Sequence, residues 1–457
     1  MSTIAGIDLG TTFSALAILN RIGKPEIVPN AEGERITPSA VYFDEEDNNV
    51  IRVGIEAINS RQLNPDRCVR WIKRHMGDRE FKKVVDGKEW TPEEISSLIL
   101  KKLKQDCSVE SGTIEDVVIS VPAHFDEVRR KATMDAGMLA GLNVIGIVNE
   151  PVAAALFYAT TCEVRGRVLV YDLGGGTFDV TVLDVDGKDI RIVCSQGDHA
   201  LGGIDFDQKV LELFEAAYRE KFNAELITNE EERARYEDEA EDVKKTLSRR
   251  PVAKKMLYGQ AGSMRLEITR EQFEQAIAPL IARTDILVEV SLEEAGCTPA
   301  DVNKILLVGG STRIPLVQRR LEETFGFAPE VAVNVDEAVA LGAAIHAGLT
   351  TLREAPDKLD EGTAGGLRDV KLQDVCNHSY GTICAPRDAE TGQYVVQNSI
   401  ILRKNTPLPC EATQRFFTMV DGQTELQVTI TQGEDTDPDY VNTVSYTHLT
   451  LPTNREV

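Results

Sequence analysis

The chain has 457 residues, of which 42% are hydrophobic, and its formal net charge is −24. This length accommodates two or three domains with a large core, and the composition is typical of a soluble globular protein. The strong negative charge argues against nonspecific binding of nucleic acid. No apolar run is long enough to cross a bilayer, and the first residues lack a basic leader with a cleavage site. We therefore expect a cytoplasmic protein with no membrane partner.

Eight cysteines are scattered along the chain, at positions 68, 107, 162, 194, 297, 376, 384 and 410, and none belongs to a Cys-x-x-Cys motif. This distribution indicates neither a zinc site nor a framework of disulfides. We expect most of these cysteines to be small buried hydrophobic residues.

A glycine-containing motif occurs twice, as Gly6-Ile-Asp-Leu-Gly-Thr-Thr12 and, about 165 residues later, as Tyr171-Asp-Leu-Gly-Gly-Gly-Thr-Phe-Asp179. Each copy predicts a β-hairpin, because an apolar run precedes the glycines and alternating apolar residues follow them. Glycines let backbone N–H groups approach phosphate oxygens, and threonines add hydroxyl donors. A single copy would be an ordinary turn more often than not. The repetition favours two related half-domains that hold one nucleotide between them.

Each copy also carries an aspartate at the end of its apolar run, Asp8 in the first and Asp172 in the second. Carboxylates in this position can bridge to phosphates through a hydrated divalent cation. The two residues are therefore candidate ligands of a metal ion, through its waters.

Three further segments extend the pattern. Residues 305–320 predict a buried strand, a glycine loop and a helix with Pro315 in its first turn, and such a loop can accept a flat base. Residues 117–125 predict a strand, and residues 147–155 predict a strand that ends in the acidic Glu150 before a helix.

Together with Trp71-Ile-Lys-Arg74 and Leu201-Gly-Gly-Ile-Asp-Phe206, the order of these motifs resembles the 70-kDa heat-shock chaperones. That family belongs to the superfamily of actin, sugar kinases and chaperone ATPases. The resemblance runs from residue 4 to about residue 350. It implies an α/β, actin-like (duplicated, ribonuclease H-like) two-lobed ATPase domain with ATP or ADP and Mg²⁺ as cofactors.

The resemblance also implies roles for individual residues. Lys73 would place positive charge beside the γ-phosphate, and Glu150 would orient the attacking water or accept its proton, with Asp172 and Thr177 completing the catalytic group. Asp8 and Asp172 would position magnesium through its waters. Without the resemblance, Lys73 would be interpreted as a solvated helix residue and Glu150 as a helix N-terminal acid. The residues implied to bind the phosphates are Gly10, Thr11, Thr12, Gly174, Gly175, Gly176 and Thr177, and Gly202 and Gly203 are implied to bind the nucleotide as well.

The segment 229–250 predicts a charged helix in which four residues share one face by their i, i+3, i+4 and i+7 spacing. An ion-paired, solvated face is the simpler interpretation. The resemblance implies instead that this face contacts adenosine. Lys245 stands where many members have arginine, and because an ammonium lacks the planar guanidinium, stacking on the base would be weaker. The residues implied to form the nucleoside pocket are Glu241, Lys244, Lys245, Ser248, Gly309, Gly310, Ser311, Arg313 and Asp336.

The sequence divides into four parts. Residues 1–352 are the expected ATPase domain, with lobe I at about 1–170 and lobe II at about 171–352. Residues 353–374 are expected to be a flexible connector and an interdomain linker, in which Val370 and Leu372 face inward at a sheet edge. Residues 375–443, with alternating segments at 394–402, 415–420 and 426–430, predict an incomplete peptide-binding β-sandwich. Residues 444–457 do not resemble the family and are expected to be a foreign tail on a truncated product.

The resulting functional hypothesis is an ATP-dependent chaperone whose hydrolysis of ATP switches its affinity for unfolded polypeptide segments. The resemblance adds a J-domain cochaperone and a nucleotide-exchange factor as partners, while His124 stands where tyrosine is usual in the family. A nucleotide-binding scaffold with a vestigial ATPase is one alternative. A metabolite kinase of the same superfamily is another, but no phosphoacceptor site is evident.

Overall fold

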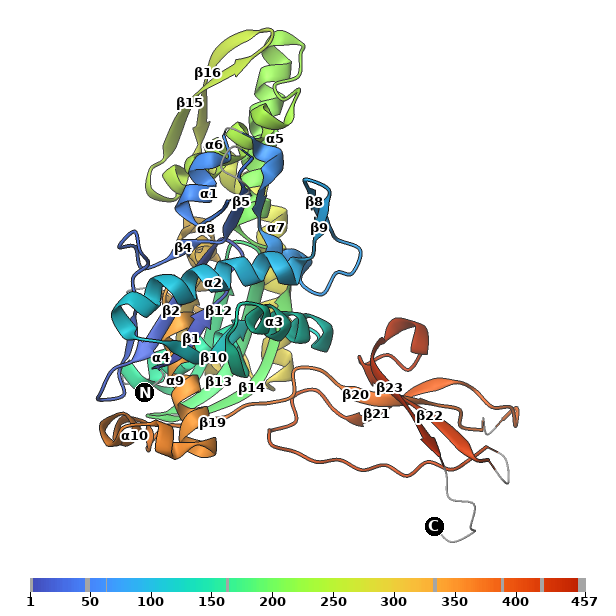
Figure 1. Ribbon diagram of the computed structural model, residues 1–457. Helices are drawn as coiled ribbons and strands as arrows, with labels where there is room; N and C mark the ends of the chain where they lie inside the picture. The colour runs from blue at the N-terminus through green and yellow to red at the C-terminus, as the bar shows by residue number, and fades with distance from the viewer. Residues whose placement is uncertain are drawn as a thin grey trace.

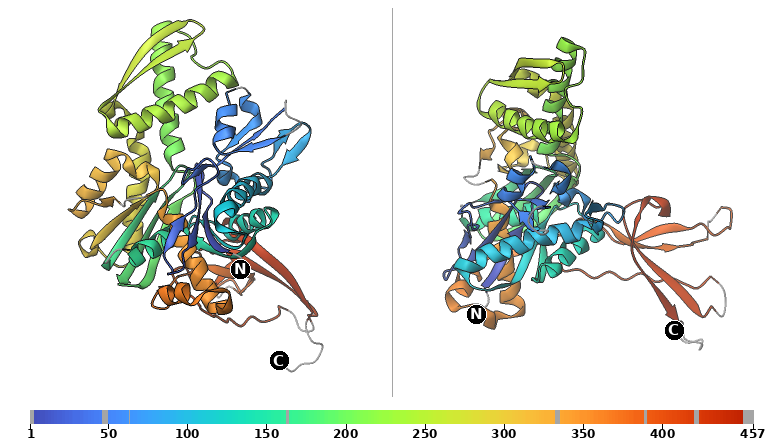
Figure 2. Two further views of the ribbon diagram at one scale, coloured as in Figure 1. Left: turned by 60° about the vertical axis from the view of Figure 1, so that its left-hand side comes forward. Right: turned by 45° about the horizontal axis from the view of Figure 1, so that its top comes forward.

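The computed structural model describes residues 3–45, 50–62, 64–161, 164–331, 335–387, 390–419 and 423–450. Most of the chain up to about residue 373 forms an α/β body with two lobes, and the residues that follow form an antiparallel sheet that projects from one side of this body (Figure 1, Figure 2). The body corresponds to the expected ATPase domain.

Each lobe is built on one mixed sheet, and the two sheets have equivalent strand orders. The first has the order β11-β10-β1-β2-β3, with β4 beside β2, and the second has the order β18-β17-β12-β13-β14-β19. In both, the motif-bearing strand pairs antiparallel with the next strand and parallel with a later one. The predicted hairpins and duplication are therefore confirmed. The strands are β1 (Thr3–Asp8), β2 (Phe13–Leu19), β3 (Pro25–Ile27), β4 (Thr37–Pro38), β10 (Ile114–Val121), β11 (Asn143–Asn149), β12 (Arg165–Leu173), β13 (Phe178–Asp186), β14 (Asp189–Asp198), β17 (Lys304–Val308), β18 (Glu330–Val331) and β19 (Lys371–Gln373).

Helices α4 and α9 cross between the two sheets. A Cβ added at Gly342 of α9 would lie 1.6 Å from the Ala153 carbonyl oxygen of α4, and one at Gly6 of β1 would lie 2.0 Å from the Ala344 nitrogen. These approaches are closer than any side chain allows. Helix α9 thus follows lobe II in sequence but packs on the sheet of lobe I, and β12 begins at Arg165, before the expected boundary near residue 170. The helices are α1 (Ile55–Ser60), α2 (Pro92–Ser111), α3 (Glu127–Leu139), α4 (Glu150–Thr161), α5 (Gly203–Phe222), α6 (Glu230–Arg249), α7 (Arg270–Glu294), α8 (Pro315–Phe325), α9 (Ala338–Glu354) and α10 (Glu361–Leu367).

Smaller elements extend each lobe beyond its sheet, and in the left view of Figure 2 those of lobe II reach the top of the molecule while those of lobe I lie lower and opposite them. In lobe I they are α1 and the sheet β6-β5-β7, and in lobe II they are α5, α6 and the hairpin β15-β16. None of the helices that the structure describes is both long and apolar enough to cross a bilayer. The remaining elements are β5 (Ala40–Phe43), β6 (Ile51–Val53), β7 (Cys68–Arg70), β8 (Lys83–Val85), β9 (Lys88–Trp90), β15 (Val252–Gly259), β16 (Gly262–Thr269) and the 3₁₀-helices η1 (Pro65–Arg67), η2 (Ile72–His75), η3 (Pro299–Asp301), η4 (Gly310–Arg313), η5 (Pro356–Lys358) and η6 (Pro438–Tyr440).

The connector after α9 is ordered, so the expectation of a flexible segment was wrong. Its residues form η5 and α10, and the Asp360 side chain caps α10 by accepting from the Thr363 N–H at 2.9 Å. Glycines that suggested flexibility serve close packing, since a Cβ at Gly362 would lie 2.2 Å from the Arg21 carbonyl oxygen. The linker strand β19 then pairs parallel with β14, with Val370 buried, Leu372 half-buried and packed against the core, and Lys371 exposed, as expected for a strand at a sheet edge.

The C-terminal strands form one antiparallel sheet with the order β21-β20-β22-β23. A second layer is not seen in the described part of the chain, so the predicted β-sandwich is reduced here to a single sheet. The expected strand at 415–420 is wrong for 415–419, which have no regular structure. Residues 444–450 of the expected tail belong to β23, while residues 451–457 lie outside the described residues. The strands are β20 (Tyr380–Cys384), β21 (Gln397–Leu402), β22 (Glu425–Gln432) and β23 (Asn442–Thr450).

Candidate functional site

A cavity of about 400 Å³ lies between the two lobes, where the turns of both motif hairpins meet. Most of the residues expected at the site border it, although they come from seven separate segments of the chain. The expected residues that line it are Asp8, Gly10, Thr11, Thr12, Lys73, Glu150, Asp172, Gly174, Gly175, Thr177, Glu241, Lys244, Lys245, Ser248, Gly309, Gly310, Ser311, Arg313 and Asp336. Sequence reasoning missed the lining residues Phe13, Ile36, Arg249, Val308, Ile314, Val335 and Val339.

The two hairpin turns contact each other across the cavity. A Cβ at Gly175 would lie 1.7 Å from the Thr12 hydroxyl oxygen, and one at Gly176 would lie 2.5 Å from the Thr11 methyl carbon. Within the first turn, the Gly10 N–H donates to the Ser14 hydroxyl at 3.2 Å. Glycine is therefore required where the turns approach, and their backbone N–H groups and threonine hydroxyls are concentrated in one place, which suits a polyphosphate.

Three of the glycines expected to bind the nucleotide, Gly176, Gly202 and Gly203, are not among the residues that line the cavity. Gly203 and Ile204 donate backbone N–H bonds to the carbonyls of Gly174 and Gly175, at 3.0 and 2.9 Å. Gly202 and Gly203 therefore pack against the second turn and support it, whereas Gly176 belongs to that turn and meets Thr11 of the first turn.

Lys73 and Glu150 form a buried ion pair at the cavity. Lys73 belongs to η2, and Glu150 is the first residue of α4. Burial disfavours the Lys73 ammonium, but the carboxylates of Glu150 and Asp8 outweigh it and raise the pKa of Lys73. Burial raises the pKa of Glu150 to about 7 against the opposing charge of Lys73. Lys73 therefore stays charged, and Glu150 is suited to exchange a proton near neutral pH.

The site carries an excess of buried carboxylates. Burial raises the pKa of Asp8, whose Oδ1 accepts a bond from the Ser120 hydroxyl at 2.9 Å, and raises that of Asp172 well above its usual range. Asp179 is buried, and its Oδ2 has no hydrogen-bond partner. One lysine does not balance these acids, so a cation fits the site. Among the described residues no three His, Cys, Asp or Glu groups are arranged to hold a metal ion directly, so this cation would keep waters.

Asp179 ends the second motif, and its contacts were not anticipated. Its Oδ1 accepts bonds from the Ala123 N–H at 3.1 Å and from His124 Nδ1 at 2.9 Å. Arg130 Nη2 donates to the Ala123 carbonyl at 3.1 Å and to Asn149 Oδ1 at 2.7 Å, next to Glu150. The loop after β10 is thereby tied to the second motif of lobe II.

One wall of the cavity, called here the nucleoside wall because the sequence predicts that it contacts the nucleoside, is formed by α6 and the loop after β17. Lys244 Nζ donates to the Gly203 carbonyl at 2.9 Å and to Asp207 at 2.8 Å, and Lys245 Nζ pairs with Glu241 at 2.8 Å. The Ser248 hydroxyl donates to the Lys244 carbonyl at 3.0 Å. The predicted helix face thus borders the cavity, and several of its polar side chains already form hydrogen bonds or ion pairs with other groups of the protein.

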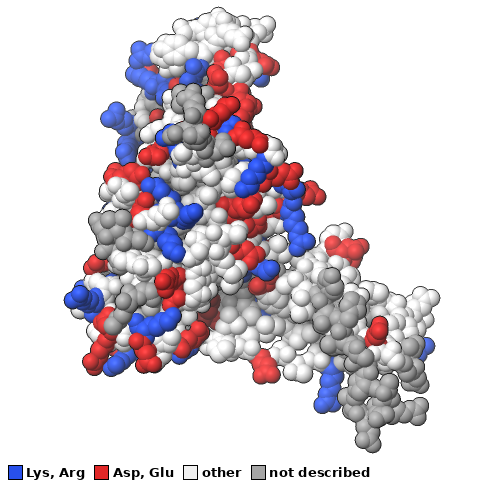
Figure 3. Space-filling view, viewed as in Figure 1, with Lys and Arg blue, Asp and Glu red and all other residues white. Residues whose placement is uncertain are grey.

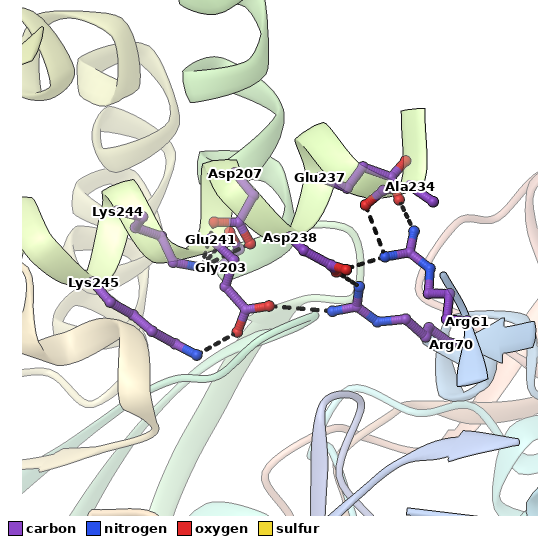
Figure 4. Close-up of polar contacts among 10 residues, drawn as sticks. All are labelled: Arg61, Arg70, Gly203, Asp207, Ala234, Glu237, Asp238, Glu241, Lys244 and Lys245. Carbon is purple, nitrogen blue, oxygen red and sulfur yellow. Dashed lines mark hydrogen bonds and ion pairs between the residues drawn. The ribbon is translucent and has the colours of Figure 1, made fainter. Parts of the chain in front are cut away.

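A row of ion pairs joins the two lobes beside this helix face (Figure 4). Arg70 of β7 pairs with Asp238 at 2.8 Å and with Glu241 at 3.2 Å, both on α6. Arg61 pairs with Asp238 at 2.5 Å and also with Glu237. Because Glu241 lines the cavity, this row of pairs links lobe I to the nucleoside wall of lobe II. Sequence reasoning missed it, since neither Arg61 nor Arg70 belongs to a recognised motif.

Comparison with known proteins shows the family of the chain. The family model described as Hsp70 protein matches residues 4–450. The chain belongs to the Hsp70 family. The chaperone protein DnaK of Thermotoga neapolitana is 40% identical over 441 residues, which cover 94% of this chain and 70% of the relative. The DnaK proteins of Thermotoga petrophila and Thermotoga maritima are 39% identical over the same shares. As a member of this family, the chain is an Hsp70-type chaperone and an ATPase.

Proposed function

We propose that this Hsp70 hydrolyses Mg-ATP in the interlobe cavity and that hydrolysis switches the affinity of its C-terminal part for extended apolar peptide. The observation that carries the proposal is the buried Lys73–Glu150 pair beside two facing turns of glycine and threonine. We place this activity in the cytoplasm. The proposed partners are unfolded polypeptide, a J-domain cochaperone and a nucleotide-exchange factor.

In the proposed mechanism the chain acts through positioning and electrostatics. Thr12, Thr177 and the glycine backbone of both turns would hold the phosphates, and Asp8 and Asp172 would hold the waters of a magnesium ion. Bound magnesium neutralises phosphate charge. Lys73 would place its charge at the transferred phosphate, and Glu150 would orient the water or take its proton.

The C-terminal sheet contacts the body at the start of α3. The Tyr380 hydroxyl donates to Glu127 at 2.7 Å, and the Glu127 N–H donates to the Gln432 side-chain oxygen at 3.2 Å. His378 Nε2 donates to the Phe125 carbonyl at 3.2 Å. The loop that ends in Phe125 also binds Asp179 through Ala123 and His124, which supports communication between this sheet and the nucleotide site.

The C-terminal sheet and the segments that connect its strands carry apolar side chains that lie open to solvent. Ile430 of β22 is 42% exposed, Val396 just before β21 is 60% exposed, and Phe417 between β21 and β22 is 89% exposed. The face of this sheet shown in Figure 3 has few charged side chains, whereas the body has acidic and basic residues interspersed. Such a surface supports the assignment of residues 375–443 as part of a peptide-binding β-sandwich.

The test is single-turnover hydrolysis of Mg-ATP with and without an unfolded apolar peptide. We expect slow hydrolysis that the peptide accelerates. If the rate of hydrolysis is the same with and without peptide, the proposed switch is rejected, while the proposed ATPase activity stands. The alternatives of a scaffold and of a metabolite kinase are not favoured by the DnaK relatives, and a scaffold would not need the Lys73–Glu150 pair.

A further inference from the structure

A second cavity, of about 380 Å³, lies between the last turns of α9, the end of α10 and the linker strand β19. These three elements lie together at the lower end of the body in Figure 1. The second cavity shares no lining residue with the interlobe cavity. Its volume falls in the range of about 300–1,000 Å³ that is typical of small-molecule sites.

The charged groups at this cavity are all of one sign. Arg353 of α9 and Arg368, the residue after α10, line it and are exposed, and none of its described lining residues is acidic. Arg353 Nη2 donates to Glu354 at 2.8 Å, but this is an exposed pair of the kind that contributes little. In a chain with a formal net charge of −24, such a cavity is a local exception. It favours an anion, and the planar guanidinium group matches a carboxylate.

A buried histidine adds a polar group to the same wall. His346 of α9 lines the cavity, and its Nδ1 is buried with no hydrogen-bond partner in the described part of the chain. Burial, followed by the charge of Arg353, lowers the pKa of His346 to about 4, so at neutral pH the ring is uncharged and carries one N–H donor. A buried polar atom without a partner costs free energy, which a ligand that hydrogen-bonds to the ring would recover.

The rest of the lining is mostly apolar and includes the linker. Leucines of α9 and α10 line the cavity together with Val370 and Leu372. Leu372 belongs to β19, which pairs parallel with β14 of lobe II. A ligand in this cavity would therefore contact the ATPase body and the linker at the same time, and it would bury apolar area on both.

We propose that this cavity binds a small organic carboxylate with an apolar body, and that the bound ligand holds the linker strand on the ATPase body. The carboxylate accepts hydrogen bonds from Arg353, Arg368 and His346. The apolar body packs against Leu372 and the leucines of α9 and α10. The site is independent of the proposed ATPase reaction, because no residue of the interlobe cavity takes part in it.

Octanoate is the probe, and its binding is followed by NMR in the full chain with nitrogen-15 in its histidines. The His346 ring signals are identified by their loss in His346→Gln. We expect octanoate to shift them with a Kd of about 1 mM or tighter at neutral pH. Octanol supplies the apolar body alone and sulfate the charge alone, and each should bind roughly tenfold more weakly or worse. If octanol or sulfate binds as tightly as octanoate, or if octanoate leaves the His346 signals in place, the proposal is overturned.

The double variant Arg353→Gln/Arg368→Gln tests the charged end of the site. Both side chains are exposed, so this variant should fold normally, and we expect it to bind octanoate roughly tenfold more weakly. The matched control is Arg319→Gln/Arg320→Gln, which removes two exposed, ion-paired arginines of α8 that do not line the cavity. The control should bind octanoate as the unaltered chain does. Equal affinities of the two double variants would contradict a carboxylate site at Arg353 and Arg368.

Amide hydrogen exchange of residues 371–373 tests the effect on the linker. Octanoate at ten times its Kd should slow this exchange roughly threefold or more in the unaltered chain, because the ligand stabilises the state in which β19 lines the cavity. The same concentration should have no effect in Arg353→Gln/Arg368→Gln. If octanoate binds to the unaltered chain but leaves the exchange unchanged, the ligand does not hold the linker and that part of the proposal is rejected.

Discussion

Lys73 and Glu150 pair with only 5% and 9% of their side chains exposed, although 77 residues separate them in the chain. The contact joins η2 to the start of α4, the helix that packs against α9 between the two sheets. Burying two charges costs free energy that their attraction repays only with good geometry. This pair at the cavity wall is therefore better explained by a role in the reaction than by a contribution to the stability of the fold.

Replacing Glu150 by Gln should strongly slow the hydrolysis of ATP without weakening the binding of nucleotide. We expect single-turnover hydrolysis to fall roughly 100-fold or more, the usual worth of a general base, with the affinity for ADP nearly unchanged. Lys82→Ala is the control, because Lys82 pairs with Glu89 in an exposed position. If the Glu150→Gln variant hydrolyses ATP at more than a tenth of the normal rate, Glu150 is not the group that activates the water.

Arg70→Ala should accelerate release of ADP. The side chain holds Asp238 and Glu241 across the lobes, so its loss frees the nucleoside wall to move. We expect release roughly tenfold faster, the factor that about 1.4 kcal/mol represents. Stopped-flow release of a fluorescent ADP measures this rate.

The matched control is Arg67→Ala. Arg67 lies three residues away and pairs with Asp86, within lobe I. Its loss removes an arginine of the same region without touching the contact between lobes. If both variants release ADP at the same rate, the row of ion pairs does not govern the release.

The fold of the body was predictable where glycines and apolar strands recur in a fixed order. The repeated motif identified both hairpins because, in each copy, an apolar run precedes the glycines of the turn and alternating apolar residues follow them. Helix α6 was predicted from its charge spacing, and the structure begins it at Glu230 after the cap Asn229.

Other features depend on distant partners and could not be predicted. Arg61 meets Glu237 across 176 positions, which no local pattern encodes. The glycines near α10 suggested flexibility, but Gly366 allows close approach to Ile22, whose carbonyl oxygen would lie 2.4 Å from a Cβ added at Gly366. The alternation at 415–419 predicts a strand, yet the described residues offer it no strand partner.

Gly342→Ala should destabilise the body. The added methyl carbon would meet the Ala153 carbonyl at the crossing of α4 and α9, and neither backbone can move without opening the layer between the sheets. We expect a loss of about 1–3 kcal/mol or more in the free energy of unfolding, measured by chemical denaturation. Gly365→Ala in α10 has no atom within 4 Å of its new carbon and should be neutral. Equal stability of the two variants would contradict the close crossing.

His346 should make stability fall in mild acid. It lies on α9 beside a cavity of about 380 Å³ that Thr350 and Leu372 also line, and its Nδ1 has no hydrogen-bond partner. Burial, followed by the charge of Arg353, lowers the pKa of His346 from 6.5 to about 4. Between these values the unfolded chain binds a proton that the folded chain does not, so stability is complete above pH 6.5 and is lost as the pH falls toward 4.

From pH 7.5 to pH 5 this histidine should cost the folded state about 2 kcal/mol. His346→Gln stays neutral over that range, so its free energy of unfolding, followed by urea denaturation, should fall by about 2 kcal/mol less than that of the unaltered chain. Other acid-sensitive groups are common to both proteins and cancel in this comparison. Parallel losses in the two proteins would show that His346 takes up a proton equally well in the folded and unfolded states.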